Sequence, residues 1–249
     1  MSELEPESAL DLDRERDLGQ ILSTCLALYT RHFVLFAALA LGVVLPIDIG
    51  LYGVGAGELW SGYDKNLPLG VDIATNFVPT LLIVPLISAN HARAVIRLGA
   101  GNVPPIGRTL LEGLFLLPAI AFVVFLYDLG VFGGLILLIV PGIYLVVRWY
   151  VCAQAAVVDG FRGRLALDRS RDLVEGSWWR VAGISLVLYL IPAAIAWGIK
   201  LPLDDLAKQS DSGVVSLSEV VFRDTIVYSF GALSATLLYF DLRWRHDYL

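Results

Sequence analysis

The sequence has little charge, few cysteines and no common catalytic motif. Charged residues make up 17% of its 249 residues and hydrophobic residues 57%, whereas average soluble domains have about 25% charged residues. This composition is typical of membrane proteins. The two cysteines, Cys25 and Cys152, lie far apart within apolar stretches. Their positions exclude a disulfide framework and favour buried free thiols.

Chemistry-bearing motifs are also absent. No G-x-S-x-G, P-loop, G-x-G-x-x-G or H-E-x-x-H sequence occurs. The three histidines, His32, His91 and His246, are not spaced as metal ligands. Arginines cluster only beside apolar runs, so no basic patch is available for nucleic acid. We therefore expect no metal, no cofactor, no nucleic-acid partner and no enzymatic activity.

The first seventeen residues contain seven of the acids and almost nothing apolar to bury. We predict that residues 1–17 form an acidic, disordered cytoplasmic tail. A cleavable signal peptide is not expected, because such a segment begins with positive charge. The remainder, residues 18–249, is predicted to be a single transmembrane domain.

Six apolar runs follow, each near the roughly 20 residues that cross a bilayer core. The predicted fold is therefore all-α, a polytopic bundle of six transmembrane helices. Prolines lie inside five of the runs, where they kink helices or free backbone carbonyls. The approximate spans are 33–54, 77–98, 110–127, 131–158, 178–201 and 220–243.

Three shorter features complete the predicted architecture. Leu18–His32 has apolar residues at helical spacing and is predicted to be an amphipathic helix at the membrane interface. Gly160–Ser177 is predicted to contain a second such helix. Asp128-Leu129-Gly130 is interpreted as the turn between the third and fourth spans.

The distribution of basic residues predicts the orientation. If the N-terminus is cytoplasmic, all 18 Lys and Arg residues except four lie on the inner side, as the positive-inside rule requires. We therefore expect both termini in the cytoplasm. The four outer residues are Lys65, Lys200, Lys208 and Arg223.

Polar and charged residues near the inner ends of the spans have two interpretations. They are either interface anchors with extended arginine side chains, or a polar vestibule for an anionic headgroup or solute. Asp241 is expected to pair with Arg93 or Arg148. Asp48, fifteen residues into the first span, is interpreted as a solvated group near the outer interface. The predicted inner polar layer consists of Asn90, His91, Arg93, Arg148 and Asp241.

The charged segment after the fourth span also has two interpretations. It is either a solvated interfacial helix, or a docking face for a cytoplasmic partner or anionic lipid. Acids and arginines alternate along it at i, i+3 and i, i+4 spacings. The residues of the predicted docking face are Arg164, Asp168, Arg171 and Glu175.

Four segments together resemble the membrane-domain family of bacterial and archaeal glycerophosphodiesterases. They are Leu18–Phe33, Pro141–Arg148, Leu167–Val181 and Tyr239–Arg245. In fused members of that family, the membrane region precedes a catalytic phosphodiesterase barrel, and no such barrel or metal-binding set is present here. The resemblance implies a six-helix membrane protein of the cytoplasmic membrane without the enzymatic half.

These observations favour an accessory or scaffold protein that contacts membrane lipid and a cytoplasmic or membrane protein partner. The alternative is a permease or lipid-handling protein that uses the proline-broken helices and the inner polar layer. A cavity at mid-membrane depth would favour the alternative, and a packed bundle with an exposed docking face would favour the scaffold.

Overall fold

The computed structural model describes residues 11–12, 14–51, 53, 70, 77–210 and 213–248, without the side chains of 199–210, 213 and 216. These residues form helices and short connections, with no strand among them. Six helical segments are long and apolar enough to cross a membrane. The predicted all-α, multi-pass membrane fold is therefore confirmed. The six segments are Phe33–Leu51, Pro79–Gly99, Ile106–Leu137, Ile139–Val158, Trp178–Gly198 and Leu217–Tyr248.

The helices differ widely in length, from 5 to 36 residues. Residues 1–10, much of the segment between the first two spans and residues 211–212 lie outside the described part. In chain order the elements are α1 (Leu18–Arg31), α2 (Phe33–Leu51), the π-helix η2 (Pro79–Ile83), α5 (Val84–Gly99), α6 (Ile106–Leu137), α7 (Ile139–Arg148), α8 (Cys152–Val158), α9 (Arg164–Val174), α10 (Trp178–Ser210) and α11 (Gly213–Tyr248).

α1 is the predicted amphipathic helix. Its first turn is closed by a capping box, in which the Asp17 carboxylate accepts from the Gln20 amide and the Gln20 side chain accepts from the Asp17 amide, leaving few unsatisfied donors. The helix buries Ile21, Cys25 and Leu28 against the body of the protein. Burial raises the pKa of the Cys25 thiol to about 12, because the charged thiolate loses its hydration.

The predicted turn at Asp128–Gly130 is wrong. α6 continues through these residues to Leu137, and the chain reverses at Leu138, which is extended. Gly130 serves packing instead, because a Cβ there would lie 2.3 Å from the Trp149 ring. The two arms of the hairpin meet at Gly134 and Gly142, where a Cβ on Gly134 would lie 3.0 Å from the Gly142 Cα. The third span is therefore longer than predicted, and the fourth begins later.

The fourth predicted span is not one continuous helix. α7 ends at Arg148, the residues Trp149–Val151 form a turn, and α8 resumes at Cys152. The second span is likewise irregular, since a π-helical turn begins at Pro79 and passes into α5. Proline removes a backbone donor, which favours such local rearrangement. The last two helices extend past their predicted bounds, to Ser210 and Tyr248.

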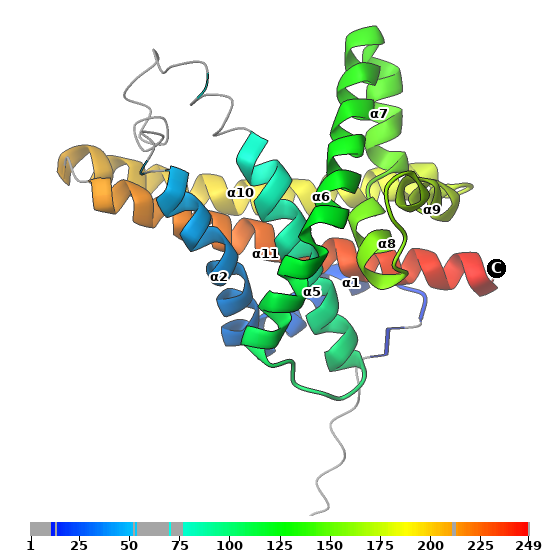
Figure 1. Cartoon of the computed structure of the whole chain (residues 1–249), viewed down its shortest axis with the longest axis horizontal. Helices are drawn as coiled ribbons and strands as arrows, with labels where there is room; N and C mark the ends of the chain where they lie inside the picture. The colour runs from blue at the N-terminus through cyan, green and yellow to red at the C-terminus, as the bar shows by residue number, and fades with distance from the viewer. Residues whose placement is uncertain are drawn as a thin grey trace, which may run out of the picture.

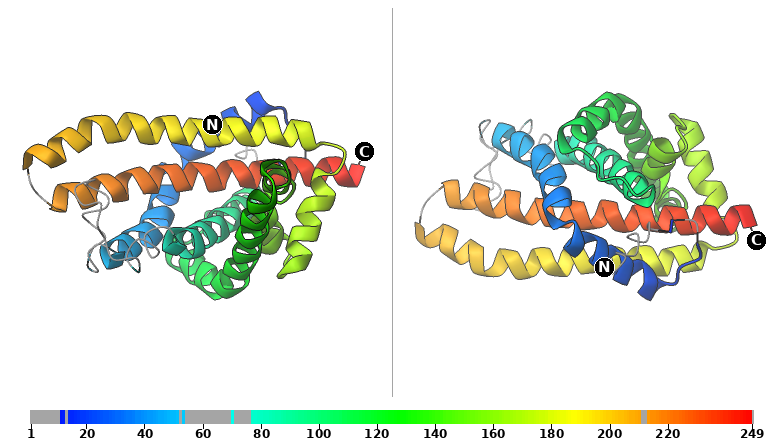
Figure 2. Two further views of the ribbon diagram at one scale, coloured as in Figure 1. Left: turned by 90° about the horizontal axis from the view of Figure 1, so that it is seen from above. Right: turned by 90° about the horizontal axis from the view of Figure 1, so that it is seen from below.

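Two helical hairpins dominate the molecule and point in different directions. α10 and α11 run side by side along the long axis, and α6 and α7 rise away from them near α8 and α9 (Figure 1). Both views of Figure 2 show α1 on the side of α11 where α10 lies, whereas α2 extends past α11 to the side where α5 and α6 lie. α11 is central, because it packs against α10, α2, α5, α1, α8 and α9.

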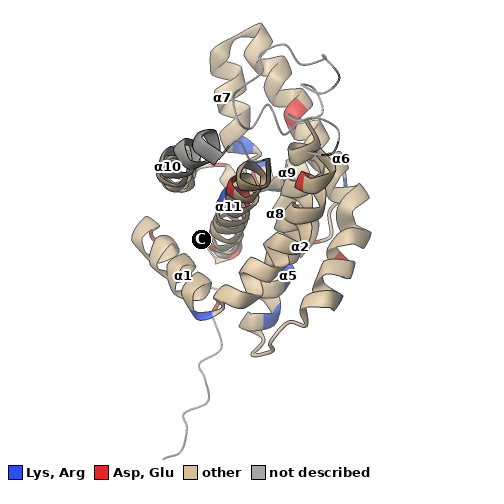
Figure 3. Cartoon of the chain, turned by 90° about the vertical axis from the view of Figure 1, so that its left-hand side faces the viewer, with Lys and Arg blue, Asp and Glu red and all other residues tan. Residues whose placement is uncertain are grey.

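Charged residues are sparse along the helices, as Figure 3 shows by the broad faces without blue or red. The tip of the α6–α7 hairpin is especially apolar and exposed. Ile136 is 85% exposed and Val140 is 76% exposed. Such a surface is stable against lipid chains but not against water.

Candidate functional site

A cavity of about 420 Å³ lies between α5, α8, α10 and α11. The cavity-lining residues of α10 and α11 fall near the middle of those helices, and the lining residues of α5 lie in its first two turns. It falls within the size range of small-molecule sites. Its walls are mainly apolar and come from Val84, Ile87, Leu188, Pro192, Val227 and Ala232 among others.

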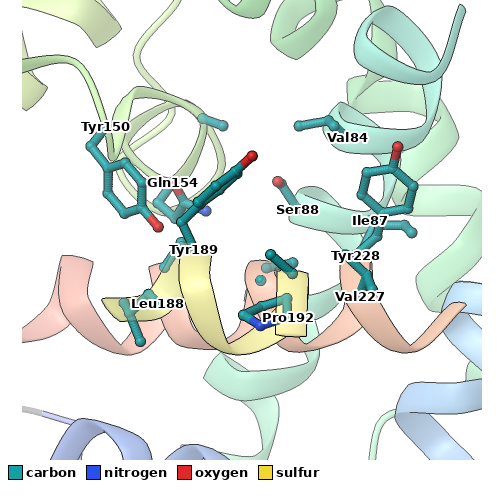
Figure 4. A pocket seen from close by; sticks show the side chains of 15 residues that line it. Val84, Ile87, Ser88, Tyr150, Gln154, Leu188, Tyr189, Pro192, Val227 and Tyr228 are labelled. Atoms are coloured by element: carbon teal, nitrogen blue, oxygen red, sulfur yellow. The ribbon is translucent and has the colours of Figure 1, made fainter. Parts of the chain in front are cut away.

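Five polar side chains line this apolar cavity. Figure 4 shows Tyr150, Gln154 and Tyr189 on one side and Tyr228 on the other, with the Ser88 hydroxyl between them. Gln154 is 3% exposed, and its Oε1 has no hydrogen-bond partner. A buried carbonyl oxygen without a partner costs about 1–3 kcal/mol. The amide is therefore available to a ligand that brings a hydrogen-bond donor.

The local sequence explains how the cavity forms. The turn at Trp149–Val151 offsets α8 from α7, and this offset places Gln154 beside α5 and α11. On α11, Gly231 lines the cavity, and a Cβ added there would meet no atom within 4 Å. Small residues at this position and at Ala232 and Ala235 leave the space open.

The cavity reaches the surface of the protein at α10. Tyr189 lines it and is 70% exposed, and the neighbouring Leu190 is 52% exposed. In a membrane-spanning helix, such exposed apolar residues face lipid chains. The opening therefore meets the hydrocarbon of the bilayer rather than an aqueous channel.

The members of the predicted inner polar layer do not bind one another in the structure: His91, Arg93, Arg148 and Asp241 have separate partners, and the Asn90 side chain has no hydrogen-bond partner. Asn90 is fully buried against Gly113 of α6, where a Cβ would lie 2.0 Å from its Oδ1. His91 is also buried, its Nε2 lies 2.7 Å from Ser229 Oγ of α11, and its ring stacks on Phe36. These contacts fix α5 against α6, α11 and α2.

The predicted ion pair of Asp241 with Arg93 or Arg148 is wrong. Its fully buried carboxylate forms ion pairs with Arg180 of α10 at 2.8 Å and with Arg245 at 3.2 Å. It also accepts a hydrogen bond of 2.7 Å from the Arg16 amide. Since Asp241 joins α10, α11 and the segment before α1, it is a structural centre.

Arg93 and Arg148 pair elsewhere. Arg93 lies 3.8 Å from Glu112, which also binds Arg97 at 2.6 Å and Arg108 at 3.1 Å. Arg148 lies 3.9 Å from Glu175 and contacts Tyr144. Arg93 and Arg148 therefore bind different carboxylates and do not line one common vestibule, and whether either arginine binds an anionic headgroup stays a prediction.

A further cluster forms around Asp159, which follows α8. Its carboxylate binds Arg169 at 3.1 Å, Arg243 at 3.5 Å and the Tyr239 hydroxyl at 2.5 Å. Burial lowers the pKa of Arg169, but its hydrogen bond with Asp159 and the nearby negative charge more than reverse this, so the pKa is raised. The cluster ties α9 to the end of α11.

The predicted docking face lies on α9 and just after it. Arg164 and Glu175 are mostly exposed, and Asp168 forms ion pairs with Arg164 at 3.8 Å and Arg171 at 3.5 Å. The opposite face of α9 buries Ala166, Leu167 and Leu173. The charges therefore satisfy one another on an exposed face, and whether a partner binds there stays a prediction.

Asp48 is not a solvated group, contrary to the sequence interpretation. It is 1% exposed, and neither carboxylate oxygen has a hydrogen-bond partner. The distance from the start of the helix suggested the interface, but the neighbouring α11 covers this face of α2.

Sequence reasoning missed Gln154, Glu112, Asp159 and Arg180. Gln154 is the single amide in the apolar run 131–158, and that isolation was a usable signal. Tyr239 and Arg243, which bind Asp159, and Asp241, which binds Arg180, lie far away in sequence, so no local pattern identifies these pairs.

No family model, curated protein or solved structure matches this chain. Within the part of the chain that the structure describes, no group of three or more His, Cys, Asp and Glu residues is arranged to hold a metal ion. The function is therefore argued from the cavity and its surroundings.

Proposed function

We propose that the protein handles a membrane lipid or a similar amphiphile, which it binds in the cavity between α5, α8, α10 and α11. The observation that carries this proposal is the unpartnered Gln154 Oε1 in an otherwise apolar wall. Apolar walls suit an acyl chain, and one amide with nearby hydroxyls suits a single donor group of the ligand.

The location of the cavity supports a lipid over a water-soluble solute. Its exposed Tyr189 lies among lipid-facing residues of α10. A charged solute would need counter-charges in the wall, and the cavity lining contains no Asp, Glu, Lys or Arg. The sequence favoured, as its alternative, either a permease or a lipid-handling protein. Of these two, the apolar lining of the cavity supports a lipid-handling protein.

The accessory or scaffold role stays a second proposal, supported by the exposed charged face of α9. The likeness to the membrane domain of glycerophosphodiesterases also stays a proposal, and it is compatible with lipid binding. We place the protein in a bacterial or archaeal cytoplasmic membrane with both termini in the cytoplasm, on the basis of its arginine distribution.

Photocrosslinking in vesicles tests the proposal. The full chain is reconstituted with a phospholipid that carries a photoreactive group in its acyl chain, and the labelled residues are identified by mass spectrometry. We expect labelling of cavity residues on α10 and α11. Gly231→Leu places a side chain in the cavity, and a Cβ added at Gly231 would meet no atom within 4 Å. This variant should therefore lower the labelling of cavity residues about tenfold.

Gly133→Leu is the matched control, because Gly133 also lies in a helix with open space around it but does not line the cavity. It should label like the unmodified protein. Circular dichroism and gel filtration of both variants establish that they fold. Equal cavity labelling in Gly231→Leu and the unmodified protein would contradict the proposal.

A further inference from the structure

Asp48 is a buried carboxylate inside a membrane-spanning helix, and it belongs neither to the cavity lining nor to the arginine clusters around Asp241, Glu112 and Asp159. It lies on α2, 1% exposed, and both of its oxygens lack a hydrogen-bond partner. An ionised carboxylate in an apolar environment without a partner is costly, by several kcal/mol even after relaxation. Such a group calls for a compensating proton, cation or ligand.

Among the residues that the structure describes, the charged neighbours of Asp48 lie on α11. It is close enough to Asp224 and Arg223 for their charges to act on it. Arg223 is already occupied, since its Nη1 lies 3.2 Å from Glu219 and its Nε lies 3.0 Å from Asp224. This group therefore contains three carboxylates and one guanidinium. The Tyr228 hydroxyl, one turn beyond Asp224, is the remaining titratable neighbour.

The other elements packed against this part of α2 contribute apolar residues. Ile83 of η2, Leu86 and Ile87 of α5 and Leu117 of α6 pack in one cluster with Val44 and Ile47 of α2. Within the part of the chain that the structure describes, no cation besides Arg223 acts on Asp48. Because Arg223 forms its ion pairs with Glu219 and Asp224, the Asp48 carboxylate forms no ion pair with it.

We propose that Asp48 is a proton-binding site, which is neutral at neutral pH in the conformation seen here and which holds α2 against α11. In uptake, a hydronium ion gives one proton to a carboxylate oxygen of Asp48: one O–H bond forms there, one O–H bond of the hydronium ion breaks, and water is left. Loss of that proton would place a negative charge beside Asp224 in an apolar cluster. The α2–α11 contact would then weaken, or Arg223 would have to turn from Glu219 or Asp224 toward Asp48.

This site adjoins the cavity wall, since Tyr228 both neighbours Asp48 and lines the cavity. The proposal nevertheless stands apart from lipid binding, because it rests on the α2–α11 contact alone. Its test therefore uses no lipid ligand, and either proposal can fail without the other.

Infrared spectroscopy of the full chain in detergent detects protonated carboxyl groups by their carbonyl stretch. We expect a band at neutral pH that disappears in Asp48→Asn and weakens at alkaline pH. Asp172→Asn, a half-exposed aspartate on α9, should leave the band unchanged. A spectrum that is the same for Asp48→Asn and the unmodified protein would overturn the proposal.

Thermal unfolding supplies an independent readout. Asparagine has the shape of a neutral aspartic acid, so Asp48→Asn should melt within a few degrees of the unmodified protein at neutral pH. The free energy of unfolding of the unmodified protein should fall as the pH is raised, because the folded state holds a proton that the unfolded state has already released. The free energy of unfolding of Asp48→Asn should fall less. A large drop in the melting temperature of Asp48→Asn at neutral pH would contradict a neutral Asp48. Stabilisation of the unmodified protein, but not of Asp48→Asn, by sodium ions at fixed pH would identify a cation site instead.

Discussion

At the scale of single residues, the charged groups of this protein mainly hold its helices together. Asp241, Glu112 and Asp159 each bind two or three arginines from different elements. A buried carboxylate with several guanidinium partners is stabilised relative to an isolated one, and removing it leaves the partners uncompensated. The exposed pairs on α9 lack this burial, so they contribute little.

This difference predicts the effect of neutralising Asp241. Asp241→Asn should reduce the free energy of unfolding by about 3 kcal/mol, because Arg180 and Arg245 lose their shared counter-charge. Titration with SDS in mixed micelles, followed by circular dichroism, measures the change. Asp168→Asn on α9 is the control and should change stability by less than about 1 kcal/mol. Similar losses in both variants would contradict the structural role of Asp241.

At the scale of elements, close helix contacts depend on glycines. The α6–α7 hairpin is the clearest case, because a Cβ on Gly142 would lie 2.8 Å from the Leu135 backbone nitrogen and 2.4 Å from its side chain. Backbone atoms cannot move aside as a flexible side-chain end can. Glycine is therefore required for the two arms to approach at this depth.

Substitution of Gly142 tests this requirement. Gly142→Ala should destabilise the protein by about 2 kcal/mol, since overpacking forces the two helices apart. Gly133→Ala, which meets no atom within 4 Å, should be neutral or stabilise by up to about 1 kcal/mol through helix propensity. The same SDS titration compares the two. A neutral Gly142→Ala would show that the hairpin is less closely packed than described.

Apolar length predicted the number of candidate spans, and helical spacing predicted a helix at α1, because both properties are local in sequence. The hairpin turn was misplaced because Asp128 and Gly130 have turn chemistry, yet Gly130 packs against Trp149 on the other arm. Asp48 was misread for a related reason, since its covering helix α11 comes much later in the chain. The cavity was not predictable, because its lining converges from four separate helices.

At the scale of the whole molecule, an even number of candidate spans predicts that both termini lie on the same side of the membrane. The positive-inside rule predicts that this side is the cytoplasm. We expect Asn102→Cys, in the turn between α5 and α6, to resist a membrane-impermeant maleimide added to intact cells, and Lys65→Cys to react. Both native cysteines are buried, so background labelling should be low. Reaction of Asn102→Cys but not of Lys65→Cys would invert the topology.

The central position of α11 also constrains the order of assembly during synthesis. α11 is the most buried span, with 78% of its apolar window inside the protein, and it follows the other five spans along the chain. Until it inserts, the His91 imidazole lacks Ser229 and the Asp159 carboxylate lacks Tyr239 and Arg243. The pairs α5–α6 and α6–α7 can pack without α11, but these polar groups gain their partners only when the last span inserts. Folding is therefore completed by the last helix of the chain.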